Sequence, residues 1–158
     1  MKALRFRRAN DRDADAISAL VVPLVEKYIV YPFEPSAASR LLDSMTAAAF
    51  AKRIIGGYRY HVAVDGDAIV GVVATKDDSH LYHLFVAESV QRHGVATALW
   101  DLARRASREA GYEGDFTVNA SRYAEGFYRK LGFERVRSAT QDGIAHVEMR
   151  LPAGTERR

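Results

Sequence analysis

The stretch Q-R-H-G-V-A at residues 91–96 follows an apolar run over residues 80–87 and opens a helical pattern that continues to about Ala110. A strand that turns into a helix across a glycine leaves free backbone N–H groups at the positive end of the helix. Gly94 has no Cβ, so the backbone there can approach a bulky group closely, and Arg92 adds charge beside it. The stretch therefore predicts a phosphate-binding loop, although an ordinary strand-to-helix turn has the same pattern.

A second informative segment follows further along the chain. Residues 116–120 are typical of a strand, and residues 121–131 are typical of a short helix that ends before Gly132. The apolar residues of this helix share one face, because they fall at i, i+3, i+4 and i+7: Ala124, Phe127, Tyr128 and Leu131. Tyr128 is therefore expected to point inward, either as an ordinary core residue or as a phenol with a function.

Taken together, the two segments resemble the GNAT (GCN5-related N-acetyltransferase) family. The resemblance rests on Q-R-H-G-V-A after a strand and on N-A-S-R-Y-A-E-G-F-Y-R-K-L-G-F at residues 119–133, and it is strong over roughly residues 80–135. Elsewhere only the order of the elements agrees. Ala96 replaces the more common second glycine of the motif, and Gln91 stands where arginine is frequent, which weakens the phosphate site slightly.

The pattern of the chain predicts an α+β domain with the element order β-α-α-β-β-β-α-β-α-β-β. This order is also what the resemblance implies: a GNAT-like (acyl-CoA N-acyltransferase) fold, with a mixed sheet of about six to seven strands flanked by about four helices. We expect one domain over residues 1–151 and a frayed tail over residues 152–158. The helical stretch that ends near Ile55 is expected to break near Ser44, and Asp65-Gly66-Asp67 predicts a hairpin turn.

Composition excludes several classes of protein. The chain has 158 residues, of which 48% are hydrophobic, enough for one domain with a sizeable core. It contains no cysteine, which excludes disulfides, thiolate metal sites and a cysteine acyl-enzyme. No signal peptide or membrane span is recognisable, so a cytoplasmic enzyme with no membrane partner is expected. The net charge of +3 is modest and dispersed, and we expect no nucleic-acid partner.

The resemblance also implies a site for acetyl-CoA (coenzyme A) as co-substrate. The backbone of one strand would pair with the pantetheine arm, as an added strand does, and the glycine loop would hold the pyrophosphate. Asn119 matches a strand-end polar residue that reaches the cofactor, and the bare backbone of Gly126 is expected to admit the arm. The residues implied in cofactor binding are Leu84, Phe85, Val86, Gln91, Arg92, His93, Gly94, Val95, Ala96, Thr97, Asn119 and Tyr128.

Tyr128 matches the tyrosine that the family places near the cofactor sulfur. A phenol with a pKa near 10 is a weaker acid than an ordinary thiol near about 8.5, so full proton transfer to the leaving thiolate is uphill in water. A hydrogen bond to the developing thiolate is therefore the expected role of Tyr128.

Acetyl transfer to an amine requires a neutral amine, and an alkylamine with a pKa near about 10.4 is almost fully protonated at pH 7. The candidate bases are His80, His83 and Glu88. Strand alternation places His80 and His83 on opposite faces unless a bulge intervenes, which argues against a two-histidine metal site. His80 lies eleven residues before Gln91, where the family often has its base, and we choose it ahead of Glu88.

The sequence thus predicts an enzyme that moves an acetyl group from acetyl-CoA to a primary amine by direct attack in a ternary complex, without a metal. The alternative is a non-catalytic acyl-CoA-binding sensor or interaction domain. The acceptor, a small-molecule amine or a protein amine, stays open, as does the oligomeric state, for which a homodimer is one option. Some residues of the first two helices and the loops beside them could favour a cationic acceptor, although solvated helix faces and chain breaks explain them equally well: Glu26, Tyr28, Tyr31, Glu34 and Asp43.

Overall fold

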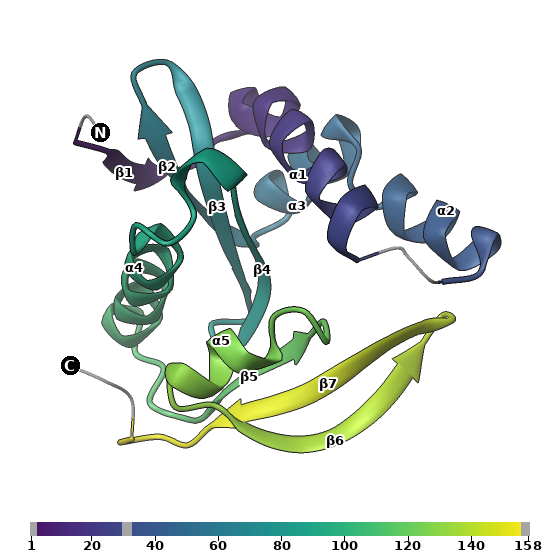
Figure 1. Cartoon of the computed structure of the whole chain (residues 1–158). Helices are drawn as coiled ribbons and strands as arrows, with labels where there is room; N and C mark the ends of the chain where they lie inside the picture. Colours follow the sequence, from purple (N-terminus) through teal and green to yellow (C-terminus); the bar gives the residue numbers. More distant parts are fainter. Residues whose placement is uncertain (1–2, 30–32, 156–158) are drawn as a thin grey trace.

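The computed structural model describes residues 3–29 and 33–155. Within these residues, seven strands form one sheet in the order β1-β2-β3-β4-β5-β7-β6 (Figure 1). The strands are β1 (Arg5–Arg8), β2 (Arg59–Asp65), β3 (Ala68–Lys76), β4 (His80–Val86), β5 (Phe116–Ala120), β6 (Glu134–Gln141) and β7 (Ile144–Leu151). The helices are α1 (Ala14–Tyr28), α2 (Pro35–Asp43), α3 (Ala47–Ile55), α4 (Val95–Glu109) and α5 (Glu125–Lys130), with short 3-10 turns η1 (Asp11–Asp13) and η2 (Glu88–Val90).

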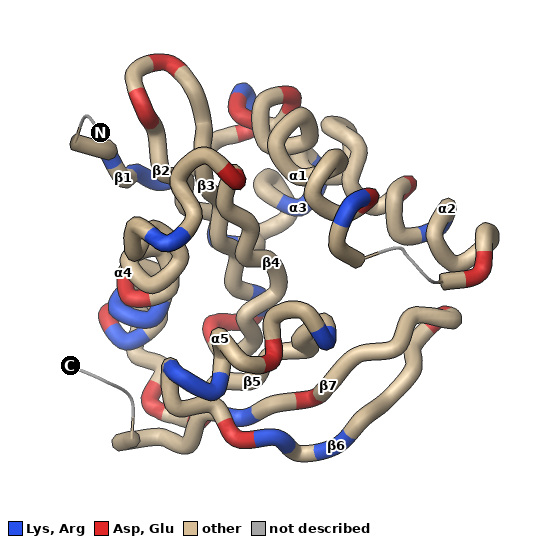
Figure 2. The backbone as a smooth tube through the Cα atoms, in the orientation of Figure 1, with Lys and Arg blue, Asp and Glu red and all other residues tan. Residues whose placement is uncertain are grey.

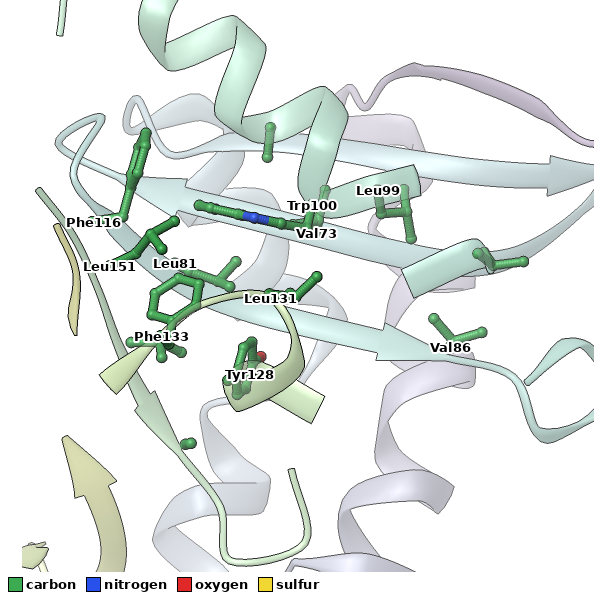
Figure 3. Close-up of a cluster of buried hydrophobic side chains, with 14 of the residues drawn as sticks. Val73, Leu81, Val86, Leu99, Trp100, Phe116, Tyr128, Leu131, Phe133 and Leu151 are labelled. Atoms are coloured by element: carbon green, nitrogen blue, oxygen red, sulfur yellow. The ribbon is translucent and has the colours of Figure 1, made fainter. Parts of the chain in front are cut away.

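Two layers of helices cover the two faces of the sheet and create two hydrophobic cores (Figure 1). On one face, α1 and α3 pack on β2 and β3 around the fully buried side chains of Ile17, Phe50 and Tyr60. On the other face, α4 and α5 enclose a larger cluster, in which Trp100 packs against Phe116 and Phe133 (Figure 3). The alternation of buried residues along β5, where Phe116, Val118 and Ala120 all face α4, follows from this arrangement.

The sheet is antiparallel except where β4 meets β5. These two strands pair in parallel at His80–Thr117 and Leu81–Val118, and α4 supplies the crossover between them. Beyond this point, the described residues of the two strands form no further pairs, so the strands separate toward the carboxyl end of β4. The sheet is therefore open where β4 runs into the glycine loop.

The expected fold class is confirmed, with one more helix than the predicted order contains. The helical stretch breaks at Ser44, as expected, and its two parts are α2 and α3. α1 continues through Pro23 to Tyr28. The start of the expected tail is held in place, because the N–H of Ala153 donates to Asp115, whereas residues 156–158 lie outside the described part. None of the described helices combines the length and apolar character that crossing a bilayer requires.

Candidate functional site

The glycine loop has the backbone geometry of an anion site. Gly94 caps α4 with a φ of 76°, in the left-handed region that favours glycine, and the preceding Arg92 has a φ of 67°. The first backbone bond of α4 runs from the N–H of Ala98 to the carbonyl of Gly94. The N–H groups of residues 95–97 therefore have no helical partner, and no side chain caps them among the described residues. These free donors and the helix dipole both favour a negatively charged group.

The side chain of Gln91 holds the loop against β4. Its Nε2 donates to the carbonyl of Val86 at 3.0 Å, so this amide ties the end of the strand to the loop. Gly71 of β3 allows α4 to approach the sheet closely, because a Cβ at this position would lie 2.9 Å from the Cδ1 of Leu99. Both contacts fix where the amino end of α4 lies relative to the open edge of β4.

A cavity of about 640 Å³ begins at this loop and continues into the opening between β4 and β5. Its walls come from the end of α1, the end of β4, the loop and first turn of α4, the segment after β5, and α5. The lining residues are Leu24, Tyr28, Ile29, Leu84, Phe85, Val86, Val90, Gln91, Arg92, Gly94, Val95, Ala96, Thr97, Ser121, Tyr123, Ala124, Phe127, Tyr128 and Lys130. A volume of this size is within the range of small-molecule and cofactor sites.

The edge of β4 that faces the opening offers unpaired backbone groups. The N–H of Ala87 donates to the carbonyl of Val70 on β3 at 2.8 Å. Because the backbone groups of an antiparallel strand alternate in direction, the N–H of Phe85 also points to β3, and those of Leu84 and Val86 point toward the opening. Of the three residues expected to face a cofactor arm, Leu84 thus presents its N–H and its carbonyl to the opening, and Val86 presents its N–H, since its carbonyl accepts from Gln91.

Tyr128 lies on α5 with its ring in the core near Phe133 (Figure 3). It also contacts Phe127 and lines the cavity. It is 5% exposed, and burial raises the pKa of its hydroxyl far above 10. The hydroxyl has no hydrogen-bond partner among the described residues, so a bound molecule can accept from it. At neutral pH, Tyr128 is therefore a neutral donor.

The expectation that His80 and His83 point apart is wrong. In the register of β4 with β3, Ala74 pairs with His83 and Thr75 with Leu81, which leaves Tyr82 as an extra residue in a bulge. The bulge shifts the alternation by one residue, so both histidines lie on the face away from α4. His83 contacts Phe50 of α3, and His80 bonds Thr117, whose strand neighbours Phe116 and Val118 face α4.

The two histidines differ in their surroundings. The Nδ1 of His83 lies 3.0 Å from the hydroxyl of Tyr60, and burial lowers the pKa of His83 to about 3, so this imidazole is a buried neutral group. His80 is partly buried at the start of β4, where its Nδ1 lies 2.7 Å from the Oγ1 of Thr117. Burial, assisted by Lys76 and His146, lowers the pKa of His80. His80 is therefore uncharged at neutral pH and is the more accessible of the two.

Glu88 belongs to a different cluster. Its carboxylate accepts hydrogen bonds from Lys27 at 3.0 and 3.1 Å and from the hydroxyl of Tyr28 at 2.9 Å. These bonds lower the pKa of Glu88, which makes it a poorer base. The ring of Tyr28 also stacks on that of Tyr123, with centroids 4.6 Å apart. The end of α1 is thus joined both to η2 and to the segment after β5.

Not every implied residue reaches the cavity. The cavity lining does not include His80, His93 or Asn119. The side chains of His93 and Asn119 are exposed, and both residues are close in sequence to residues that do line the cavity. Gly126 is also absent, and a Cβ added there would meet open space, so the expectation that its bare backbone admits a cofactor arm has no support in this packing. Tyr123 was missed by sequence reasoning, because nothing local marks a tyrosine that will stack on a residue of α1.

The positions of Lys and Arg are interspersed with those of Asp and Glu along most elements of the backbone in Figure 2, with no large region of one sign. Among the expected acceptor residues, Tyr28 lines the cavity, whereas Glu26, Glu34 and Asp43 do not, and Tyr31 lies outside the described residues. Among the described residues, no three His, Cys, Asp or Glu side chains lie together in a group that could hold a metal ion.

Comparison with known proteins gives the geometry a context. The profile of the family described as "Acetyltransferase (GNAT) domain" matches residues 29–153. A comparison with curated protein sequences found no match.

Among solved structures, a GCN5-related N-acetyltransferase from Rhodopseudomonas palustris is similar, with 24% identity, a TM-score of 0.77, and coverage of 96% of this chain and 97% of that one. The PaiA N-acetyltransferase from Thermoplasma acidophilum, solved in complex with coenzyme A, has 11% identity, a TM-score of 0.78, and coverages of 96% and 99%. The apo form of YjaB from Escherichia coli has 19% identity, a TM-score of 0.74, and coverages of 95% and 98%. At these identities the likeness establishes the fold.

Proposed function

Because this chain belongs to the GNAT acetyltransferase family, we propose that it transfers an acetyl group from acetyl-CoA to a primary amine by direct attack within a ternary complex. One observation carries the proposal: a single cavity connects the free N–H groups after Gly94, the unpaired edge of β4 and the hydroxyl of Tyr128. The free N–H groups suit a pyrophosphate, and the unpaired strand edge suits an amide-containing arm. The buried hydroxyl suits a departing thiolate, which needs a hydrogen-bond donor.

The residues of the loop and of β4 would hold the co-substrate. The N–H groups of residues 95–97 and the guanidinium of Arg92 suit the pyrophosphate. The peptide groups of Leu84 and Val86 suit the amides of the arm, and a free N–H on this edge can polarise the acetyl carbonyl. The bound molecule supplies the activated acetyl group, and the protein supplies its orientation.

His80 is our candidate for the base. It lies on the sheet face away from α4, at the closed end of the opening between β4 and β5, and its lowered pKa keeps it neutral at pH 7. With Nδ1–H donating to Thr117, its Nε2 is free to accept a proton from the amine, directly or through water. Deprotonating an alkylamine with a pKa of 10.4 costs about 4.6 kcal/mol at pH 7, so such a base has a large effect.

Tyr128 would donate a hydrogen bond to the sulfur as the thiolate departs. Its raised pKa makes complete proton transfer still less favourable than in water, so the contribution is stabilisation of developing charge in a dry cleft. Loss of one such preorganised donor typically lowers kcat by about 10²-fold or more. We expect Tyr128→Phe to reduce kcat strongly while coenzyme A still binds.

The test combines calorimetry with coenzyme A and an assay of free thiol released from acetyl-CoA across a panel of amines. Gly94→Val should weaken coenzyme A binding by about tenfold or more, because a side chain at a positive φ distorts the loop. Gly66→Val is the matched control, since Gly66 also has a positive φ and open space around it but lies in the β2–β3 turn. Absence of coenzyme A binding by the unmodified protein would refute the proposal, and binding without turnover of any amine would refute the enzymatic part.

A further inference from the structure

A second, smaller cavity of about 290 Å³ lies beside the first. Its lining consists of Tyr28, Ile29, Phe33, Ser121, Arg122, Tyr123 and Ala145. The two cavities share four lining residues, which are Tyr28, Ile29, Ser121 and Tyr123. The stacked rings of Tyr28 and Tyr123, inclined by 22°, therefore form part of the partition between the two spaces.

We propose that this second cavity binds the acceptor, and that the acceptor is a small monoamine carrying an aromatic or apolar body and a carboxylate, as aromatic α-amino acids do. The inference rests on the proposed acetyl transfer and adds the substrate class. An amine held here is separated from the larger cavity by the tyrosine pair, and the reacting nitrogen reaches the acetyl group past these rings.

The charge of the lining selects for an anionic group. Arg122 is the charged member of the lining, and it has no hydrogen bond or ion pair within the described chain. No acidic side chain is among the described residues that line this cavity. Glu88, which bonds to Tyr28, is already paired with Lys27. A polyamine would therefore bring further positive charge beside an arginine and find no carboxylate to pair with it.

The rest of the lining selects for an apolar body. Three aromatic rings, those of Tyr28, Phe33 and Tyr123, join Ile29 and Ala145 around the space. Tyr123 is 60% exposed although it is large and partly apolar, so a ligand that covers it removes apolar surface from water. The volume lies at the small end of small-molecule sites, which favours a single compact molecule over an extended peptide.

The experiment compares kcat/KM, measured by thiol release, for L-phenylalanine, 2-phenylethylamine and spermidine. We expect L-phenylalanine to exceed 2-phenylethylamine, which lacks the carboxylate, by about tenfold or more, and spermidine to be the poorest. Arg122→Gln should lower kcat/KM for L-phenylalanine about tenfold or more, leave that for 2-phenylethylamine within about twofold, and leave coenzyme A affinity unchanged. Arg129→Gln is the matched control, because Arg129 is an exposed arginine of α5 that pairs with Glu125 outside both cavities.

Two results would overturn the inference: a preference for spermidine, or an equal effect of Arg122→Gln on all three amines. Either leaves the acetyl transfer intact, because thiol is still released. Failure of the proposed function is a different result, namely no coenzyme A binding or no thiol release with any amine. Tyr123→Phe should keep the stack and the selectivity, whereas Tyr123→Ala should raise KM for L-phenylalanine.

Discussion

The hydrogen bond between His80 and Thr117 decides which nitrogen of the imidazole can take up a proton. The two side chains come from adjacent parallel strands, and their 2.7 Å contact lies at the last rungs before the strands separate. If Nδ1 donates to Thr117, Nε2 is left as the acceptor, which is the tautomer that a base needs. Thr117 is then a positioning residue for His80.

Thr117→Val tests this arrangement at the residue scale. The variant keeps the shape of the side chain but removes the oxygen, so we expect kcat to fall about three- to tenfold with KM for acetyl-CoA unchanged. The pKa of His80 is lowered in the wild-type protein. The acid limb of the wild-type pH profile of kcat/KM should therefore lie below pH 6.5, and kcat/KM should fall as the pH decreases because His80 becomes protonated. Thr117→Ser should restore kcat. A wild-type kcat and pH profile in Thr117→Val would contradict the role.

Single residues also show where sequence reasoning succeeds and where it stops. Gly94 could be recognised because its conformation is needed locally, at a strand-to-helix turn. The prediction that His80 and His83 lie on opposite faces of the sheet was wrong. One extra residue, Tyr82, reverses the alternation of side chains along β4, and no residue type marks a bulge in the sequence. The stack of Tyr28 on Tyr123 was missed for another reason, since it depends on tertiary packing between distant segments.

Among the elements, the packing of α4 on β3 controls the position of the glycine loop. An added Cβ at Gly71 would lie 2.9 Å from Leu99 and 3.3 Å from Val95, both side-chain atoms of α4. Close packing of a helix on a sheet leaves no room for extra methyl groups without displacing one element. The loop before α4 therefore depends on a glycine of β3 that does not itself line the cavity.

Gly71→Val should lower the free energy of unfolding by about 1–3 kcal/mol through overpacking. It should also weaken coenzyme A binding, because lifting the first turn of α4 moves the free N–H groups away from β4. Urea unfolding and calorimetry measure the two effects. Combining Gly71→Val with Leu99→Ala should give a loss smaller than the sum of the single losses; strict additivity would show that the two side chains do not compete for the same space.

The elements themselves were largely predictable, because they rest on local signals. The Asp65-Gly66-Asp67 turn, the alternation of β2 and β3, and the apolar period of α4 all lie within short windows of sequence. The strand β6 of the closing hairpin has a different origin, and it extends from Glu134 to Gln141. Most residues of β6 are exposed, so the sequence of this strand has no clear hydrophobic pattern. The strand is defined instead by its pairing with β7.

At the scale of the whole molecule, two buried histidines link stability to pH. Burial lowers the pKa of His61 to about 4 and that of His83 to about 3. Below about pH 6.5 the unfolded chain binds protons that the folded chain does not, so stability is complete above this pH and is lost as pH falls toward the folded values. Acid should therefore destabilise the fold well before its carboxylates titrate.

His61→Leu should remove part of this dependence. The Nδ1 of His61 is buried without a hydrogen-bond partner in the described chain, so the substitution loses no bond. We expect the gain in the free energy of unfolding to be about 2 kcal/mol larger at pH 5 than at pH 7.5. Urea unfolding at both pH values provides the measurement, with His93→Gln as the control at an exposed position. An equal effect at the two pH values would show that His61 does not contribute to the pH dependence of the free energy of unfolding.

The order of the elements along the chain could be predicted from local patterns, and the parallel pairing of β4 with β5 could be predicted from the helix that links them. The proposed acceptor cavity could not be predicted, since its lining comes from the end of α1, from Phe33 before α2, from the segment after β5 and from β7. Those residues are distant in the chain and meet only when both cores have formed.

The separation of β4 from β5 has a further consequence. An unpaired strand border inside a sheet is a template for any extended chain, including a stretch of another copy of the same polypeptide. In the absence of a ligand, we expect the peptide groups of Leu84 and the N–H of Val86 to be a point at which copies can join and aggregate. If the proposed co-substrate binds along this edge, it also shields the protein from self-association, so coenzyme binding and colloidal stability depend on the same few backbone atoms.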